Sequence, residues 1–207
     1  RRVLFRSARD QAKMFKDAGA QAVEVFIYDH HGQAMFPSKI AVQHPNLKID
    51  YPGIMIEALQ AENLKIIGYL NVYTSIHLGR KHPDWLVTHA DGSNPGGAWL
   101  SYPGSWLCAS SPYMDEHFLP LLAEVLERYP LDALWLDAFC WMVITPWPTE
   151  PCQCQHCQRG FKQATGYSLP KKTLWNLETC SDDERKQWFA WKTFRLGMVA
   201  RSTPRGG

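Results

Sequence analysis

The stretch Ala133-Leu134-Trp135-Leu136-Asp137-Ala138-Phe139 holds a single acid in a run of apolar residues. It predicts a buried parallel strand, because such strands are nearly continuous in aliphatic and aromatic residues. A carboxylate that ends such a strand is costly to bury unless it is paired, hydrogen-bonded or facing water. Catalytic groups of α/β barrels lie at the carboxyl ends of the strands. Asp137 is therefore a candidate catalytic residue; the alternative is an acid that caps the next loop or pairs with a buried base.

Composition limits the classes of protein to which this chain can belong. It has 207 residues, of which 45% are hydrophobic and 13% aromatic, enough for a globular core and unlike a disordered chain. The net charge of +2 and the lack of a basic stripe predict no nucleic-acid partner. No apolar segment reaches the ~20 residues that span a bilayer, so we expect no membrane partner. Residues 1–7 and 202–207 fit no element and are expected to lie outside the domain.

Strand-like and helix-like patterns alternate along the chain. An Asp50 N-cap with Pro52 behind it marks the start of one helix. This alternation predicts parallel βαβ units. Strands are expected over residues 22–28, 64–73 and 133–139, and helices over 8–18, 50–63, 111–128, 155–165 and 182–200.

The fold class expected from this order is α/β, of the (β/α)₈ TIM-barrel type. A complete barrel takes ~250 residues, and three strands already use about 140 residues here, so residues 8–201 would be the N-terminal half, about three to four βα units. Within it, residues 85–107 predict a β-hairpin excursion, and residues 150–158 a zinc-cysteine loop. The competing interpretation is a small, complete doubly wound domain.

Three cysteines fall within six residues, in Cys152-Gln153-Cys154-Gln155-His156-Cys157. This spacing lets three thiolates meet one soft tetrahedral ion, and it favours zinc. Cys108 is the expected fourth ligand, with His156 as the alternative. Four protein ligands leave no open position, so the zinc would be structural. Disulfides are the other interpretation, but cysteines separated by one residue pair poorly with each other. A thiol-rich zinc site favours a cytoplasmic location.

Polar and aromatic residues follow the predicted strands, where a barrel carries its site. Paired imidazoles after a strand offer donors to an oxygen-rich ligand, and aromatic rings over a polar pocket suit the apolar faces of sugars. The aromatic residues could equally be loop packing. The candidate substrate-binding residues are His30, His31, Asn71, Tyr73 and Trp141.

These residues resemble two families of glycoside hydrolases. The stretch from Tyr28-Asp29-His30-His31-Gly32 to Lys39, with the later Trp135-Leu136-Asp137, is similar to the α-L-fucosidases. The resemblance implies that His30 and His31 bind the sugar and that Asp137 is the nucleophile. The cysteine pattern with Cys108 is similar to the zinc-containing β-galactosidases, in which four such cysteines hold a structural zinc. The run from residue 32 to 170 resembles most closely a group of TIM-barrel glycosyl hydrolases that combines both features.

Two residues depart from these patterns. Gly32 stands where such fucosidases usually carry Asp, and Asp137-Ala138 stands where the β-galactosidases carry Asn-Glu. The second departure argues against β-galactosidase chemistry.

The function expected from the sequence is therefore retaining glycoside hydrolysis, with a carbohydrate as substrate. Such a mechanism needs a second carboxyl group about 5–5.5 Å from the nucleophile. Glu150 is the nearby candidate, although the acid is more readily expected in later strands. Oligomers could also form through those later regions. The alternatives are a non-catalytic carbohydrate-binding or degenerate barrel with a structural zinc, and a zinc hydrolase acting on sugar acyl groups, which would need an open metal position.

Overall fold

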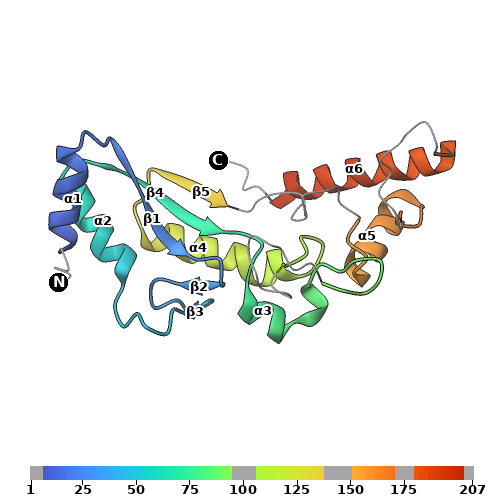
Figure 1. The fold of residues 1–207 in the computed structure, drawn as a ribbon, viewed down its shortest axis with the longest axis horizontal. Coiled ribbons are helices and arrows are strands. Elements are labelled where there is room, and N and C mark those ends of the chain that lie inside the picture. Colours follow the sequence, from blue (N-terminus) through green and yellow to red (C-terminus); the bar gives the residue numbers. More distant parts are fainter. Residues whose placement is uncertain (1–6, 95–105, 138–150, 171–179, 203–207) are drawn as a thin grey trace. The chain divides into compact units, whose positions relative to one another are not determined.

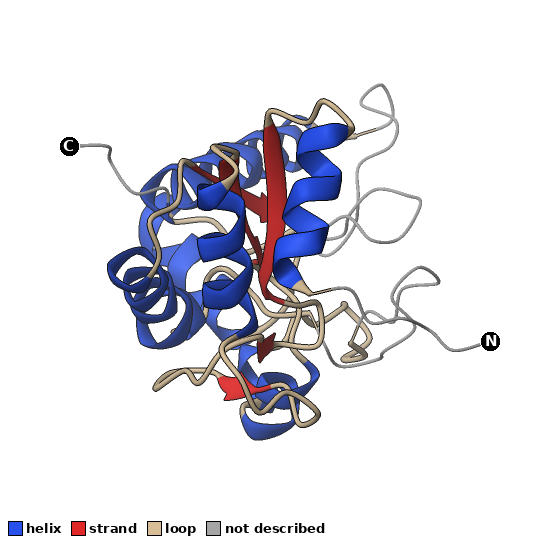
Figure 2. Ribbon diagram, turned by 90° about the vertical axis from the view of Figure 1, so that its left-hand side faces the viewer, coloured by secondary structure: helices blue, strands red, loops and turns tan. Residues whose placement is uncertain are grey.

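The computed structural model describes residues 7–94, 106–137, 151–170 and 180–202. Contacts divide the chain into two compact units. Unit 1 comprises residues 1–72 and 117–139, and unit 2 comprises residues 73–116 and 140–207. The described segments contain both helices, drawn in blue in Figure 2, and strands, drawn in red, so the fold class is mixed α/β.

The elements follow the predicted order, with additions. Unit 1 contains α1 (Ala8–Asp17), β1 (Ala22–Tyr28), β2 (Gln33–Ala34), β3 (Val42–Gln43), α2 (Tyr51–Ala61), β4 (Lys65–Asn71), α4 (Leu119–Arg128) and β5 (Ala133–Asp137). Unit 2 contains α3 (Ile76–Lys81), a 3₁₀ turn (Pro83–Trp85), α5 (Gln155–Thr165) and α6 (Asp182–Ser202). A π-helical turn, Met114–Phe118, leads into α4.

One five-stranded sheet organises unit 1, in the order β3-β2-β1-β4-β5. Strands β1, β4 and β5 are parallel and point the same way in Figure 1, as the alternating pattern predicts. The expected count of three strands is wrong, because β2 and β3 lie between the predicted strand 22–28 and the predicted helix 50–63. Each has two residues, too few to show a hydrophobic period, and only their pairing defines them.

The two faces of the long strands differ in what covers them. Val25, Ile27, Ile66 and Leu70 are buried, and a Cβ at Gly68 would lie 2.6 Å from a methyl group of Leu131. The opposite face carries a row of three aromatic rings that the register places side by side: Phe26 opposite Tyr69, and Tyr69 opposite Trp135. Phe26 and Trp135 are 45% and 55% exposed, whereas Tyr69 between them is 4% exposed.

The expectation that the Asp137 strand is buried is therefore wrong. In β5, Ala133 and Trp135 are exposed and the other residues are half-buried. The reason is position: β5 is an edge strand of the described sheet, and a strand is buried on both faces only when layers cover both.

Local signals fix the ends of the helices. Asp50 accepts a hydrogen bond from the Gly53 backbone N–H, which confirms it as the N-cap of α2. Ser7 and Asp10 form a capping box on α1, so Ser7 belongs to the folded unit. The helix predicted from residue 111 begins irregularly, and its regular part starts at Leu119. Among the described residues no helix is both long and apolar enough to cross a membrane.

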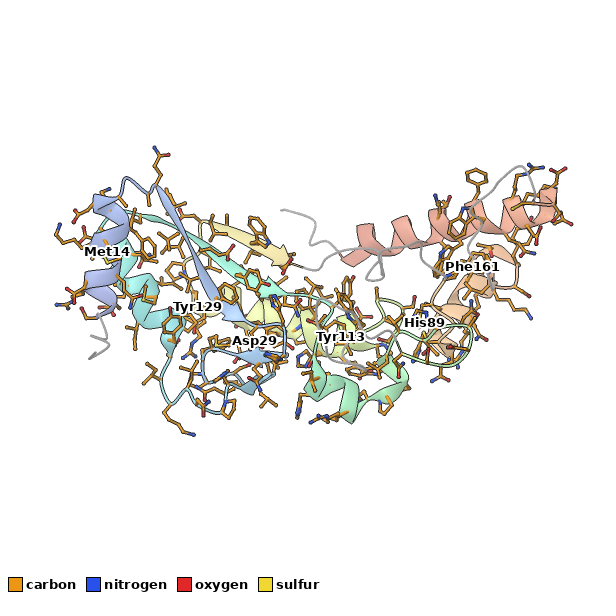
Figure 3. All side chains as sticks on the ribbon, viewed as in Figure 1. Met14, Asp29, His89, Tyr113, Tyr129 and Phe161 are labelled. Atoms are coloured by element: carbon orange, nitrogen blue, oxygen red, sulfur yellow. The ribbon has the colours of Figure 1, made fainter. Side chains whose placement is uncertain are left out.

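Unit 2 is stabilised by aromatic packing and by short antiparallel bridges. Leu86 pairs with Leu107, near the two ends of the hairpin excursion predicted over residues 85–107, of which residues 95–105 lie outside the described part of the chain. Phe161 on α5 is fully buried and packs edge-on against Trp191 and Phe194 of α6; Figure 3 labels it.

Candidate functional site

Three parallel strands of unit 1 place polar side chains at their carboxyl ends. Asp137 is the last residue of β5, and the register sets it opposite Asn71, the last residue of β4. The Asp137 carbonyl accepts a hydrogen bond from the Val72 N–H at 2.9 Å, which fixes its backbone. His30 follows β1 by two residues. The carboxyl ends of parallel strands form one edge of the sheet, where ligand sites of open and closed α/β folds occur.

The side chains of His30, Tyr69 and Asp137 meet at this edge. The Tyr69 hydroxyl donates to Oδ2 of Asp137 at 2.5 Å and lies 3.0 Å from Nδ1 of His30. A phenol has one proton to donate, so its oxygen can only accept from His30, whose Nδ1 is the nearer ring nitrogen and whose Nε2 lies 3.4 Å away. Nε2 of His30 lies 3.9 Å from the same carboxylate oxygen. The side chains of His30 and Asp137 are 36% and 42% exposed, so the group opens to solvent.

Tyr69 is held as a neutral donor. Burial, followed by the hydrogen bond to Asp137, raises the pKa of Tyr69 far above its usual range. Its ring stacks on Phe26 with centroids 4.2 Å apart. The phenol therefore keeps its proton at any physiological pH, and packing fixes its direction. Sequence reasoning missed Tyr69, although it shares a strand face with Asn71 by the two-residue period of a strand.

The other predicted site residues are placed as follows. The backbone N–H of His31 donates to Asp29, and its side chain is half-buried. Asn71 is 1% exposed. Tyr73 belongs to unit 2, is 3% exposed and contacts the Tyr113 ring at a centroid distance of 6.5 Å. Trp141 and Glu150 lie outside the described residues.

Asp29 has a structural role in the loop after β1. Its carboxylate accepts backbone N–H bonds from His31 at 3.0 Å and from Gln33 at 2.8 Å, and Figure 3 labels it beside the end of that strand. Both hydrogen bonds, accepted by Oδ1 of Asp29, close a turn that brings the chain back into β2. This turn presents His30 toward Tyr69.

Unit 2 brings together the four cysteines predicted as metal ligands. The Sγ atoms of Cys108, Cys152, Cys154 and Cys157 all lie within 4.8 Å of one another, and all four residues are buried. Cys108 is 3.3 Å from Cys157, 3.7 Å from Cys152 and 3.6 Å from Cys154. A tetrahedral zinc with Zn–S bonds of ~2.3 Å separates its sulfurs by about 3.8 Å, so the donor set fits that ion.

Backbone donors surround these sulfurs. The N–H groups of Thr88, Ser110 and Cys157 point at Sγ of Cys152, Cys108 and Cys154, at 3.5, 3.4 and 3.4 Å. Hydrogen bonds with Cys108 and Cys154, together with burial, raise the pKa of the Cys152 and Cys157 thiols. Nε2 of His156, the alternative ligand, lies 3.6 Å from an Asp84 oxygen, which is too long for a hydrogen bond.

Comparisons with known proteins relate the sequence and the fold of this chain to glycosyl hydrolases. A family model described as hypothetical glycosyl hydrolase 6 matches residues 7–138. The α-L-fucosidase isoenzyme 2 from Paenibacillus thiaminolyticus aligns with a TM-score of 0.64 and 26% identity, over 94% of this chain and 27% of that chain. The chain thus spans about a quarter of the length of that fucosidase.

A second solved structure shares the fold. It is a hypothetical protein from Ruminiclostridium thermocellum ATCC 27405, with a TM-score of 0.56 and 14% identity, over 95% of this chain and 86% of that chain. No curated protein matches the sequence. The family match covers more than half of the chain and includes His30, Tyr69 and Asp137, so this chain belongs to the hypothetical glycosyl hydrolase 6 family.

Proposed function

We propose that this chain carries the nucleophile side of a retaining glycoside hydrolase site, with Asp137 attacking the anomeric carbon of the sugar. The observation that carries the proposal is the Asp137 carboxylate at a strand end, half-exposed and hydrogen-bonded to Tyr69 beside His30. A nucleophile needs this combination of a fixed direction and access to substrate. Membership of a glycosyl hydrolase family supports the assignment.

The first substrates to test are α-L-fucosides, because the fucosidase from Paenibacillus thiaminolyticus is 26% identical over nearly the whole chain. In this proposal the sheet is the first part of a (β/α)₈ barrel, and Phe26 and Trp135 would line its interior against later strands. Their exposure of 45% and 55% supports this arrangement, because large aromatic residues left in water on one sheet face mark a surface that another layer covers.

A second carboxyl group must protonate the leaving oxygen, about 5–5.5 Å from the nucleophile in a retaining enzyme. Asp29 is not assigned this role, because two backbone N–H groups hold it in a turn. Glu150 stays a candidate. Within unit 1, His30, His31 and Asn71 stay the proposed sugar contacts, and His30 is the one joined to the Asp137 group by the bonds described above. Tyr73 and Trp141 stay expectations from the sequence.

The test uses the protein at its full natural length and a panel of 4-nitrophenyl glycosides that includes the α-L-fucoside. Asp137→Gly should lose at least ~10³-fold in kcat/KM, and added azide should restore turnover by taking the place of the carboxylate and forming a glycosyl azide. Asp132→Asn is the matched control. Asp132 lies just before the opposite end of the same strand, where it pairs with Lys65.

Retained activity in Asp137→Gly refutes the nucleophile assignment. Sugar binding without turnover by the wild type, measured by calorimetry on the same panel, would instead establish the carbohydrate-binding alternative. Equal losses in the Asp137 and Asp132 variants would show that the effect comes from damage to the strand.

We also propose a structural zinc bound by Cys108, Cys152, Cys154 and Cys157. The supporting observation is the set of backbone N–H groups aimed at three of the sulfurs, since such donors stabilise the thiolates that ligate a metal. With four thiolate ligands the ion has no open position, so this site is not expected to act on sugar acyl groups. The ion would hold the segments around residues 88, 108 and 152–157 together.

Metal analysis of protein purified without chelator should give one zinc per chain. Cys108→Ser should lose the zinc and lower the thermal midpoint of unfolding. Cys180→Ser is the control, because it alters a half-buried cysteine outside the cluster. This variant should keep the bound zinc and the wild-type thermal midpoint. The proposal is refuted if the wild-type protein holds no zinc. It is also refuted if mass spectrometry after alkylation finds these cysteines in disulfides.

A further inference from the structure

The proposed function uses Tyr69 only as a hydrogen-bond partner of Asp137 and assigns it no part in either half of the reaction, although its hydroxyl lies 2.5 Å from Oδ2 of that carboxylate. The residue is 4% exposed and comes from the strand next to the one that carries the carboxylate. The hydroxyl of a buried tyrosine usually has a hydrogen-bond partner, which can be a protein group or a water molecule. Here the partner is the proposed nucleophile.

Packing fixes the direction of the Tyr69 hydroxyl from two sides. The ring stacks on Phe26 at 4.2 Å, with an angle of 20° between the planes. His30 Nδ1 lies 3.0 Å from the phenol oxygen and supplies the bond that this oxygen accepts. The hydrogen bonds therefore run in one direction, from the His30 N–H to the Tyr69 oxygen and from the Tyr69 O–H to the Asp137 carboxylate. Bonds in such a series polarise one another.

We propose that Tyr69 is a positioning residue for Asp137: it holds Oδ2, directs Oδ1 at the anomeric carbon, and stabilises the carboxylate when that group leaves the sugar. The inference rests on the proposed function. It adds a residue to the site and predicts which half of the reaction that residue serves.

The two halves of a retaining reaction use this hydrogen bond differently. In the first half Oδ1 forms a bond to the anomeric carbon while the glycosidic bond breaks, and the second carboxyl group protonates the leaving oxygen. Asp137 loses negative charge in this step, so the Tyr69 bond weakens and helps mainly by orientation.

In the second half water adds to the anomeric carbon and gives its proton to the second carboxyl group. The electron pair of the ester C–O bond returns to Asp137, which regains its charge. A hydrogen bond to a charged acceptor is about twice as strong as one to a neutral acceptor, so the Tyr69 donor stabilises this departure. Loss of the hydroxyl should therefore slow the second half more than the first.

The experiment compares Tyr69→Phe with Tyr129→Phe in the full-length protein. Both changes remove one hydroxyl that donates to an aspartate, and both leave the ring in place. The Tyr129 hydroxyl donates to Asp50 at 2.6 Å, at the N-terminus of α2. Far-UV circular dichroism checks the fold of each variant. The kinetic readout is stopped-flow release of 4-nitrophenol from the glycoside that the wild type hydrolyses best.

Tyr69→Phe should lower kcat by about 10- to 100-fold, the range expected for a hydrogen bond to a charged group. KM should fall with kcat, and the first turnover should release about one equivalent of nitrophenol per chain in a burst, because the glycosyl-enzyme accumulates. Tyr129→Phe should keep the wild-type kcat and show no such burst. His30→Gln, a second variant at a partly exposed position, should change kcat in the same direction by several-fold.

A Tyr69→Phe protein with wild-type kcat, or with a loss matched by Tyr129→Phe, refutes the role of Tyr69 while leaving the nucleophile assignment intact. Loss of kcat with an unchanged KM and no burst also refutes it, because a merely structural defect behaves in this way. If no glycoside is turned over by the wild type, the proposed function fails and this inference fails with it.

Discussion

Replacement of Asp50 tests the account of how unit 1 is held together. Its carboxylate accepts from the Gly53 N–H at 2.9 Å, from Arg128 at 2.8 and 3.0 Å, and from the Tyr129 hydroxyl at 2.6 Å. One side chain thus joins the start of α2 to the end of α4. Burial alone would raise the pKa of Asp50, but the hydrogen bonds from Tyr129, Gly53 and Arg128 together hold it below its ordinary value.

The expected cost of Asp50→Ala is the sum of three losses. The N-cap contributes about 1 kcal/mol. The hydroxyl of Tyr129, a residue that is 5% exposed, loses its acceptor, which costs about 1–2 kcal/mol. The ion pair with Arg128, whose side chain is 40% exposed, adds at most ~1 kcal/mol because solvent screens it. Asp50→Ala should lower the free energy of unfolding by about 2–4 kcal/mol, and Asp50→Asn, which keeps the cap, by about 1 kcal/mol.

The assay is urea unfolding followed by far-UV circular dichroism at pH 7 and at pH 3, analysed by linear extrapolation. Because the folded pKa of Asp50 lies below its unfolded value, its contribution is fully present above the unfolded pKa, near 4. It is lost as pH falls through the folded pKa. The difference between wild type and Asp50→Asn should therefore shrink at pH 3.

Asp17→Ala is the control, because it removes a solvent-exposed ion pair with Lys13 and should leave stability unchanged. Equal stability of wild type and Asp50→Ala at pH 7, or a difference between wild type and Asp50→Asn that grows on acidification, would contradict the reasoning.

Two further substitutions test the packing of each unit. Gly68→Ala places a methyl group 2.6 Å from a Leu131 methyl and should cost about 1–3 kcal/mol in urea unfolding; an unchanged midpoint would mean that β4 is not packed closely on this face. Phe161→Ala removes a fully buried ring from its edge-on contact with Trp191 and should cost about 3–5 kcal/mol. Phe189→Ala, which removes a ring that is 56% exposed, should cost little, and equal losses from the two would refute the assigned core.

The sequence alone predicts the long elements of this fold because each carries its own signal. The apolar runs mark β1, β4 and β5, and Asp50 with Pro52 marks the start of α2. Strands β2 and β3 have no such signal, since two residues show no period. The six-residue α3, capped by Ser75, was missed for a similar reason. The exposure of Trp135 depends on which layers cover a sheet face, and no pattern within the strand reveals that.

The candidate site was predictable in its residue types but not in its contacts. Asp137 and His30 stood out because polar residues at strand ends are unusual in apolar runs. Tyr69 is not predictable as a site residue, because a tyrosine inside a strand is usually a core residue. Only the structure, in which Tyr69 lies opposite Trp135, shows that its hydroxyl reaches Asp137. The four cysteines were predicted as a set from spacing and resemblance. Their convergence in unit 2 came from the fold.

The most direct test of the central claim is to label the full-length protein with a 2-deoxy-2-fluoroglycosyl fluoride of the sugar it hydrolyses. Trypsin should release residues 129–159 as one peptide, which contains Asp132, Asp137 and Glu150, and fragment-ion spectra separate the three. The account predicts one adduct per chain, on Asp137. An adduct on another carboxylate, or turnover without any covalent adduct, would contradict it.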